Sequence, residues 1–392
     1  MSKLVLIAGA GMGGLSAAIA CARGGKPPRV IEQATRFDEA GAGIQLGPNA
    51  TRVLQAWGLA GALAQVAAFP SRLSVRSADS GDVLAQLQLG AAALERYGAP
   101  YATLHRADLH RMLLDAATAA GADVVLGARI DSVRESADAV QVDVAGLQHP
   151  LEGDVLVGAD GLWSRVRQQF WADSTPLPTG HLAYRTLIAQ DALPPALRSD
   201  DVTVWLGPRL HVVTYPVHLG HWLNVVAIVH GAPAGDPREW DQAAAGPDLM
   251  RALGATCAAL QDLVAAAPAW RLWVLHERPP LKGAQAMSHG RVALLGDAAH
   301  PMRPYLAQGA GMAIEDAQEL GRCLGTAGGR PGEASAALRR YALNRWERCA
   351  RVQRQAERNG RIFHATGPVQ WGRDLSLRLL GERLLDQPWL YR

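Results

Sequence analysis

A glycine cluster near the N-terminus constrains the fold of this chain more than any other feature. An apolar run at residues 4–8 predicts a buried parallel strand, and an alanine-rich run at residues 13–23 predicts a helix. Between them, residues 9–14 read Gly-Ala-Gly-Met-Gly-Gly and fit the pattern G-x-G-x-x-G. A second strand, at residues 29–31, is followed by Glu32. These segments predict a βαβ unit of the kind that opens a nucleotide-binding α/β domain.

The spacing within this unit predicts a dinucleotide site. Gly9 permits a tight turn, Gly11 lets a pyrophosphate approach the backbone, and Gly14 allows the helix to pack closely on the strand. The amides and the dipole at the helix N-terminus then bind the phosphate charge. Glu32 is placed to accept hydrogen bonds from a ribose 2′-hydroxyl. The pattern does not distinguish FAD from NAD, and the alternative is a glycine-rich turn without a ligand.

A segment far downstream favours FAD. Residues 291–301 read Arg-Val-Ala-Leu-Leu-Gly-Asp-Ala-Ala-His-Pro, so a buried strand again ends in a glycine and a carboxylate, Gly296 and Asp297. In a protein that binds FAD in extended form, this acid would contact the ribityl hydroxyls. A Gly-Ala-Gly sequence at residues 309–311 then opens a helix whose N-terminus would stabilise negative charge on a reduced flavin. The alternative is a strand–turn–helix in which Asp297 is only a cap.

A third segment also follows a predicted strand, at residues 154–157. It contains an Asp160-Gly161 turn with Ser164 and two arginines close behind. Such a turn could serve a phosphate, or it could simply end the strand. Taken alone, the turn is the better interpretation.

The middle of the chain predicts an antiparallel sheet inserted into the nucleotide domain. Alternating apolar residues predict strands at 182–189, 202–206, 211–216 and 222–230, and residues 247–266 predict a helix. Pro331 marks a boundary before a long, arginine-rich amphipathic helix at residues 334–363. We therefore expect an α/β protein with a discontinuous FAD-binding domain, a mostly antiparallel substrate domain and a C-terminal helical region. The respective bounds are 1–72, 98–180 and 277–330; 73–97 and 181–276; and 331–392.

Charge and composition exclude several classes of function. The net charge is +3 from 39 basic and 36 acidic residues, which is too mild for a nucleic-acid-binding protein. Glycines interrupt the first apolar run, which argues against a signal peptide or a membrane span. The four cysteines have no Cys-x-x-Cys spacing, so we expect a reducing, cytoplasmic location. The twelve histidines are dispersed, and we expect no metal site.

The three segments, in this order, resemble the fingerprints of group A flavoprotein monooxygenases, the aromatic hydroxylases related to p-hydroxybenzoate hydroxylase (PHBH). The resemblance runs from the N-terminus to about residue 365. Residues 41–49, 97–101, 104–109 and 301–316 are most similar to 6-hydroxynicotinate 3-monooxygenase and 3-hydroxybenzoate 6-hydroxylase, with salicylate hydroxylases further away.

This resemblance implies a PHBH-type fold with a Rossmann-like FAD domain of the glutathione-reductase type. It also implies one FAD per chain, NADH or NADPH as reductant, and dioxygen as co-substrate. The family's chemistry uses a flavin C4a-hydroperoxide to hydroxylate a small aromatic or heteroaromatic acid that already carries a hydroxyl group. Neither nucleic acid nor a membrane is an expected partner, and a homodimer is one assembly that the chain allows.

His211 and Tyr215 are the predicted catalytic residues. They share one face of the predicted strand at 211–216 because side chains alternate with period two. A general base near the ring hydroxyl would give the more nucleophilic phenolate, histidine titrates near neutrality, and tyrosine can relay a proton. The two subgroups named above carry a similar pair at this spacing. The alternative is that both are half-buried sheet residues with satisfied polar ends.

The remaining predicted site residues follow from the motifs and from the resemblance. His300 is expected to be structural. The predicted substrate-binding residues are Gln45, Tyr101, Arg185 and Tyr305. The predicted cofactor-binding residues are Gly9, Gly11, Gly13, Gly14, Glu32, Gln33, Arg106, Leu126, Asp160, Gly296, Asp297, Gly309, Ala310 and Gly311.

Three other functions compete with the hydroxylase. The first is a flavin reductase or dehydrogenase on the same fold, without oxygen insertion. The second is a flavoprotein that binds an aromatic ligand without catalysis. The third, a plain NAD-dependent dehydrogenase, leaves Gly296, Asp297 and the glycine-rich helix start unexplained.

Overall fold

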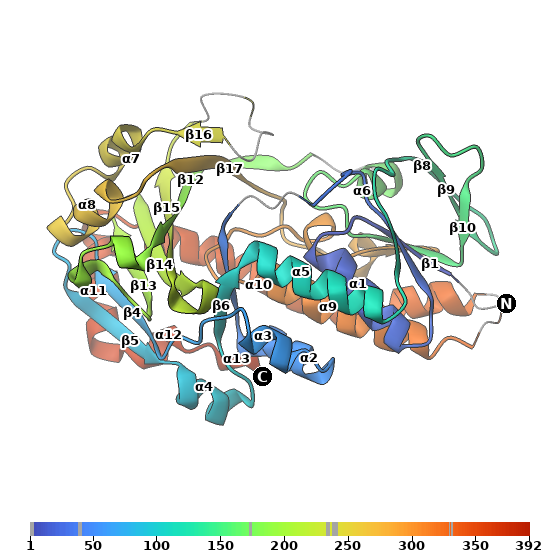
Figure 1. Ribbon diagram of the computed structural model, residues 1–392, viewed down its shortest axis with the longest axis horizontal. Helices are drawn as coiled ribbons and strands as arrows, with labels where there is room; N and C mark the ends of the chain where they lie inside the picture. The colour runs from blue at the N-terminus through green and yellow to red at the C-terminus, as the bar shows by residue number, and fades with distance from the viewer. Residues whose placement is uncertain are drawn as a thin grey trace. The chain divides into compact units, whose positions relative to one another are not determined.

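The computed structural model describes residues 4–37, 41–171, 175–232, 236, 242–328, 330 and 332–392 (Figure 1). The chain forms two compact units, and each contains three stretches of sequence. The first unit comprises Met1–Asp38, His110–Leu177 and Glu277–Ala356. The second comprises Glu39–Leu109, Pro178–His276 and Glu357–Arg392.

The first unit is built on a mainly parallel sheet. Its strand order is β18-β19-β11-β1-β2-β7, and only β18 is antiparallel to its neighbour. The central strand β1 is fully buried because it has a neighbour on each side and helices nearby, which explains its unbroken apolar sequence. The strands are β1 (Val5–Ala8), β2 (Pro28–Ile31), β7 (Asp123–Val125), β11 (Val155–Gly158), β18 (Ser288–His289) and β19 (Val292–Leu294).

Two helices of this unit, α1 (Met12–Arg23) and α9 (Gly309–Gly325), pack tightly against one another. A Cβ on Gly321 would lie only 2.6 Å from the carbonyl oxygen of Ala20, so the two backbones touch where they cross. The hydroxyl of Tyr341, on α10 (Glu333–Phe363), donates to the carbonyl oxygen of Leu294 at 2.9 Å. The elements α5 (Arg106–Ala119), α6 (Arg165–Phe170), β8 (Ile130–Glu135), β9 (Val140–Val144) and β10 (Leu151–Gly153) complete this part of the chain.

The second unit is built on a larger sheet, with the order β16-β17-β12-β15-β14-β13-β4-β5. On β12, β14 and β15, every second side chain points to the same face of the sheet, and these side chains form one apolar core with α7 (Gly246–Leu253) and α8 (Ala258–Ala265). Tyr184, Val212 and Val225 are examples. The remaining side chains of these strands therefore lie on the opposite face. The strands are β4 (Arg72–Ser77), β5 (Val83–Gln88), β12 (Leu177–Ala189), β13 (Val202–Gly207), β14 (Leu210–Val217), β15 (Trp222–His230), β16 (Gln242–Ala244) and β17 (Trp270–Glu277).

A two-stranded ribbon and several helices complete the second unit. Strand β3 (Gly43–Leu46) pairs with β6 (Ala102–His105), and the C-terminal residues are fixed because Arg52 Nη2 donates to the carbonyl oxygen of Tyr391 at 2.5 Å. The helices are α2 (Pro48–Ala56), α3 (Ala60–Ala64), α4 (Gly90–Tyr97), α11 (Gly367–Leu380), α12 (Glu382–Leu385) and α13 (Pro388–Tyr391).

The structure differs from the sequence-based elements and boundaries in three places. The single helix predicted at 247–266 is wrong, because Gly254 adopts φ +65° and separates α7 from α8. Residues 39–72 and 98–109, expected in the FAD-binding domain, belong to the second unit, because β3 and β6 pair with each other there. The predicted C-terminal region at 331–392 is shared between the units.

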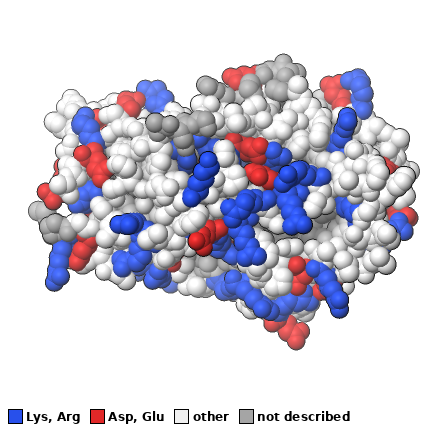
Figure 2. All heavy atoms as spheres, turned by 180° about the vertical axis from the view of Figure 1, so that it is seen from behind, with Lys and Arg blue, Asp and Glu red and all other residues white. Residues whose placement is uncertain are grey.

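Surface charge is relevant to binding of nucleic acid, and the length and apolar character of the helices are relevant to a membrane span. On the face shown in Figure 2, acidic side chains are interspersed among the basic ones, so the described residues there present mixed charge. Among the described helices, none combines the length and the apolar character needed to cross a lipid bilayer.

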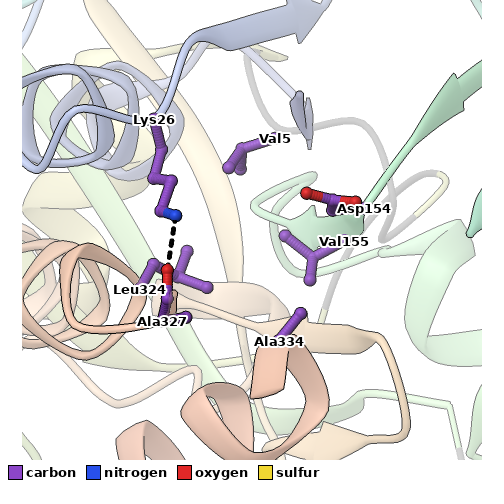
Figure 3. A pocket seen from close by; sticks show the side chains of 7 residues that line it. All are labelled: Val5, Lys26, Asp154, Val155, Leu324, Ala327 and Ala334. Atoms are coloured by element: carbon purple, nitrogen blue, oxygen red, sulfur yellow. Dashed lines mark hydrogen bonds between the residues drawn. The ribbon is translucent and has the colours of Figure 1, made fainter. Parts of the chain in front are cut away.

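A small cavity of about 20 Å³ lies at the edge of the parallel sheet where β1 and β11 begin (Figure 3). Lys26 closes one side of it by donating from Nζ to the carbonyl oxygen of Ala327 at 2.8 Å. The cavity has room for about one water molecule. It lies at the opposite end of these strands from the glycine motif.

Candidate active site

The glycine motif has the geometry that a pyrophosphate requires. Gly9 adopts φ +94°, and a Cβ there would lie 2.7 Å from the carbonyl oxygen of Ala159. A Cβ on Gly14 would lie 1.9 Å from the carbonyl oxygen of Gly9, so helix and strand meet at backbone distance. By contrast, a Cβ on Gly11, the residue that caps α1, would have no atom of the described residues within 4 Å. The motif therefore combines two positions closed by packing with open space at the helix N-terminus, which fits the phosphates of FAD. Gly13 is closed as well, by the side chain of Leu295.

Glu32 is fixed beside this helix terminus. Its Oε2 accepts a hydrogen bond from the amide of Ala10 at 2.7 Å, and its Oε1 accepts one from the amide of Ala34 at 2.8 Å. Glu32 thus organises the loop, a role that the sequence did not indicate. Its contact with a ribose stays a prediction. Gln33, directly after it, is exposed.

An open hollow of about 550 Å³ is lined by residues of α5 and β7. Leu126, which is 39% exposed, lines it together with Phe37 and Val124. The hollow is largely apolar and neighbours the end of β2, where Glu32 follows. This is a suitable place for an adenine ring, as the predicted role of Leu126 requires.

Asp160 caps a helix. Its Oδ2 accepts hydrogen bonds from the amides of Arg165 at 2.7 Å and Val166 at 3.2 Å, and Ser164 Oγ accepts one from the amide of Arg167 at 2.9 Å. The interpretation of this segment as a turn that ends the strand is therefore correct for one carboxylate oxygen of Asp160. The other, Oδ1, is buried and has no hydrogen-bond partner among the described residues. Burial raises the pKa of Asp160 despite these hydrogen bonds.

Arg167 joins the second and third motifs. It is buried, and its Nη1 donates to the carbonyl oxygens of Ala298 at 3.1 Å and Ala299 at 2.9 Å. Those residues directly follow Gly296, which adopts φ +58°, and the exposed Asp297. The three motifs, distant in sequence, therefore lie together around the carboxyl ends of β1, β11 and β19.

A buried ionic cluster anchors the start of α9. Asp316 Oδ2 lies 2.5 Å from His300 Nε2, and its Oδ1 accepts from Arg345 Nε at 2.7 Å. Burial alone would raise the pKa of Asp316, but His300 and Arg345 hold it well below the usual range. Asp316 Oδ2 also accepts from the amide of Gly296 at 3.2 Å. The expected structural role of His300 fits this arrangement.

The helix start itself is where the sequence placed it. Helix α9 begins at Gly309 and continues through Ala310 and Gly311, after Ala307 at φ +51°. Ala310 and Gly309 are partly exposed, so backbone amides at this terminus are accessible to a ligand. A flavin edge is a suitable ligand for such a terminus.

In the second unit, strand β14 carries His211, Val213 and Tyr215 on the face opposite the apolar core, as its period-two pattern predicts. Across from them, β15 places Val226 opposite Val213 and Asn224 opposite Tyr215. The two valines are partly exposed, whereas Tyr215 and Asn224 are buried, with exposed fractions of 4% and 0%. The face thus has a small apolar floor with polar groups at one end.

Tyr215 belongs to a hydrogen-bonded set with Gln45 and Tyr101. Tyr101 donates from its hydroxyl to Gln45 Oε1 at 2.7 Å, and a hydrogen bond between Gln45 and Tyr215 slightly offsets the effect of burial, which raises the Tyr215 pKa. Strand β3 can approach this closely because residue 43 is glycine: a Cβ on Gly43 would lie 2.5 Å from the Tyr215 ring. Three residues predicted separately are therefore brought together.

Asn224 is a candidate site residue that the sequence pattern did not indicate. Its Oδ1 accepts from the amide of Gly43 at 2.7 Å, and its Nδ2 is buried without a hydrogen-bond partner among the described residues. The available signal was an asparagine in the otherwise apolar strand at 222–230. A buried amide donor of this kind calls for an acceptor, which a ligand can provide.

His211 and Tyr215 lie on the same face of β14, but they do not form a hydrogen bond with each other. They are four positions apart, which corresponds to about 13 Å along a strand. His211 Nδ1 instead lies 2.7 Å from His364 Nε2. Burial lowers the His211 pKa to about 3, and the charge of His181 lowers it further in the same direction.

The other predicted residues occupy separate places. Arg185, 2% exposed, stacks on Trp273 with its guanidinium carbon 4.4 Å from the ring centroid. Arg106 begins α5, and its amide donates to the carbonyl oxygen of Ala42 at 2.9 Å. Tyr305 belongs to the first unit, is 4% exposed, and has its pKa raised by burial.

Comparisons with known proteins identify the family of the chain. Residues 3–356 match the family model described as "FAD binding domain". The chain is 40% identical to a 3-amino-4-hydroxybenzoate 2-monooxygenase of Streptomyces platensis, covering 99% of this chain and 95% of the relative. It is 35% identical to a 3-hydroxybenzoate 6-hydroxylase of Polaromonas naphthalenivorans, with the same coverage. The crystal structure of Klebsiella pneumoniae HpxO with FAD and uric acid superposes with a TM-score of 0.85 at 26% identity, covering 98% and 94% of the two chains.

The predicted fold and family are confirmed. The family model spans most of the sequence, and the relatives align over nearly their whole length. The glycine motif, Asp160 and the Gly296 segment converge as an extended FAD requires. The chain belongs to the FAD-binding-domain family and, within it, to the group A flavoprotein monooxygenases.

Proposed function

We propose that this protein is an FAD- and NAD(P)H-dependent monooxygenase that hydroxylates a small aromatic or heteroaromatic acid already carrying a hydroxyl group. The observation that carries the proposal is the face of the large sheet on which two partly exposed valines are bordered by Tyr215 and Asn224. An apolar floor suits an aromatic ring, and converging polar groups at its edge suit the ring substituents. The relatives' names, which specify amino- and hydroxybenzoates, support the same substrate class.

Bound FAD supplies electron transfer from NADH or NADPH and the activation of dioxygen. The residues that would hold it are the glycine motif with Glu32, Asp160, and the segments around Gly296 and Gly309. Their open space at the helix terminus and the unpartnered Asp160 Oδ1 support this placement.

We assign the contact with the ring hydroxyl to Tyr215. Burial raises its pKa, so the phenol stays protonated and donates a hydrogen bond. A hydroxyl oxygen that receives hydrogen bonds is more readily ionised, and the resulting phenolate is the electron-rich ring that accepts oxygen. Gln45 holds Tyr215 in place, and Asn224 Nδ2 is the second proposed donor to the substrate.

His211 remains a proposed aid to deprotonation, but it lies about 13 Å along β14 from Tyr215, so it would act through intervening groups and not by direct contact with the ring hydroxyl. With its pKa lowered to about 3, the imidazole is neutral near pH 7 and able to accept a proton, although it is a weak base. Arg185 lies on the same face, across from Val226, and is the proposed partner of the substrate carboxylate. Tyr101 in the second unit and Tyr305 in the first are each a proposed substrate-binding residue.

The proposal is tested by product formation under labelled dioxygen. Hydroxybenzoates and hydroxypyridine carboxylates are screened for stimulation of NADH and NADPH consumption, and the products are identified by mass spectrometry. We expect one labelled oxygen atom in the product of at least one acid. A flavin reductase or a non-catalytic binder would give no labelled product with any of them, and that result would refute the proposal.

Two variants separate substrate chemistry from folding. Tyr215→Phe removes the donor, and we expect slower hydroxylation by about tenfold or more with FAD retained. Tyr184→Phe is the matched control, because Tyr184 lies on the other face of the sheet, in the apolar core. Equal turnover in the two variants would exclude Tyr215 from the reaction.

We further propose a cytoplasmic homodimer. The described cysteines are free, and three of the four are buried, which suits a reducing compartment. On α11, Trp371, Leu375 and Leu379 recur every four residues and are 73%, 57% and 73% exposed. A second copy of the chain would cover this apolar stripe, and light scattering of Leu375→Glu against wild type tests the assignment.

A further inference from the structure

Four histidines that are far apart in sequence meet at one corner of the large sheet. His181 lies on β12, His211 on β14 and His230 on β15, and His364 directly follows α10. All four belong to the second unit. The dispersed histidines of the sequence are thus clustered by the fold.

Three of them present nitrogens that are close enough to share one ion. Ring nitrogens of His181, His230 and His364 lie within 4.8 Å of one another, and Nε2 of His181 is 3.1 Å from Nε2 of His230. Zinc–nitrogen bonds of 2.0–2.1 Å in a tetrahedral site place two ligand nitrogens about 3.3 Å apart. Small rotations of the rings would therefore bring the three into coordinating positions.

The backbone holds these side chains in register. His181 and His230 are direct partners in the β12–β15 pair, so their side chains project from the same face. Arg209, at φ +59°, donates its amide to the carbonyl oxygen of His364 at 3.2 Å and accepts from the amide of His230 at 3.2 Å. One turn therefore fixes His364 against His230.

The end of α10 is fixed from its other side. Arg373 Nη1 donates to the carbonyl oxygens of Ile362 at 3.3 Å and Phe363 at 2.7 Å. The positive charge of Arg373 disfavours a nearby cation, but its Nε is paired with Asp374 at 2.8 Å, which offsets part of that charge. His364 is thus held by bonds at the residues before it and at its own carbonyl.

The chemistry of the cluster suits a transition metal. Imidazole nitrogen is a preferred ligand of Zn²⁺, Co²⁺, Ni²⁺ and Cu²⁺, and it coordinates only when it is unprotonated. His230 is exposed, which gives an ion access and leaves a coordination position open to water.

We propose that His181, His230 and His364 form a binding site for a divalent metal ion of the Zn²⁺ or Co²⁺ type, with His211 as the residue that orients His364. The contact between His211 Nδ1 and His364 Nε2 at 2.7 Å fixes the orientation of the His364 ring, as partners of metal-bound imidazoles commonly do. We assign Nδ1 of His364 as its ligand atom. The bound ion would join β12 and β15 to the end of α10.

The test is a titration of the FAD-loaded, chelator-treated protein with CoCl₂, followed by absorption beyond the flavin bands and by calorimetry. We expect one Co²⁺ per chain at this site, with the absorption of a low-symmetry nitrogen site, and displacement by Zn²⁺. In His230→Ala, we expect the affinity to fall by at least about tenfold. Because His230 is exposed, this variant is expected to fold as the wild type does.

Two control variants assign the ion to the cluster. His149→Ala removes another exposed histidine, and His218→Ala disrupts a second group of potential ligands formed by His105, Asp108 and His218. Both controls should bind Co²⁺ as the wild type does. The proposal is overturned if no Co²⁺ binds, if His230→Ala binds it with unchanged affinity, or if His218→Ala abolishes the binding. A shift in melting temperature with Zn²⁺ that is present in wild type and absent in His230→Ala would support it independently of turnover.

Discussion

The substitution Asp316→Asn tests how the start of α9 is held. Asp316 is fully buried, and it faces His300, 1% exposed, and Arg345, 8% exposed. Breaking a buried pair by neutralising one partner leaves the other charge uncompensated and costs about 3–5 kcal/mol. The amide of Gly296 also loses an anionic acceptor. Since whole proteins are stable by roughly 5–15 kcal/mol, we expect a large loss of stability in this variant.

The control lies one turn further along the same helix. Glu319 pairs with Arg322 at 2.6 Å, but the two side chains are 19% and 56% exposed. Such a partly solvated pair contributes about 0–1 kcal/mol. Glu319→Gln is equally isosteric, so the difference between the two variants isolates burial from helix position.

The assay is urea unfolding followed in parallel by far-UV circular dichroism and by release of flavin fluorescence, at a fixed excess of FAD. Two probes are needed because a two-unit chain with a cofactor need not unfold in one step. We expect the Asp316→Asn midpoint to move to lower urea by both probes, and flavin to leave first. A midpoint within the range of Glu319→Gln would refute the view that the buried carboxylate anchors α9.

Three further predictions concern the cofactor loop, its bracing and the histidines. Gly14→Ala should prevent stable folding of the nucleotide unit, because its Cβ would lie 1.9 Å from a carbonyl oxygen. Gly11→Ala should fold but bind FAD more weakly. Melting of the apoprotein and titration with flavin distinguish the two variants. Arg167→Met should lower stability by about 1–3 kcal/mol, because two buried carbonyls lose their donor, and unfolding of the holoprotein measures this. The metal-free protein should lose stability as the pH falls below 6.5, because the folded pKa of His364 is lowered to about 2 and the unfolded chain then binds more protons. His364→Gln should flatten that slope in urea titrations on either side of pH 6.5, and an unchanged slope would contradict the assignment.

The local geometry of the candidate cofactor-binding segments could be predicted from the sequence because its signals are local. The strand, the glycines, the helix and Glu32 lie within about thirty residues and report one βαβ unit. Gly296 and the helix start at Gly309 are equally local. What the sequence could not show was bracing between segments, such as Arg167 donating to carbonyls more than a hundred residues away.

The candidate substrate face of the large sheet was predicted less completely because its geometry depends on strand pairing. Period two placed His211 and Tyr215 on one face, and this is correct. It could not show that His211 turns towards His364, 153 residues later in the chain. Nor could it show Asn224 opposite Tyr215, since that neighbour is set by the register of β14 against β15. Alternation specifies a face, whereas only the register specifies which residues of that face are neighbours.

The register of β14 against β15 also places two different groups of side chains, a histidine cluster and a Tyr–Asn pair, at opposite ends of one sheet face. Reading along β14, the face carries His211, then Val213, then Tyr215, and β15 matches the last two with Val226 and Asn224. In the proposed site, a ring over the two valines would reach the phenol of Tyr215 and the amide of Asn224 at one end. The histidine cluster at the other end is tied instead to His364 and to the exposed His230. Because one row of apolar side chains separates these ends, an ion at the histidines would act on the site through the position of His211 and β14, and not by direct contact with the ring substituents beside Tyr215.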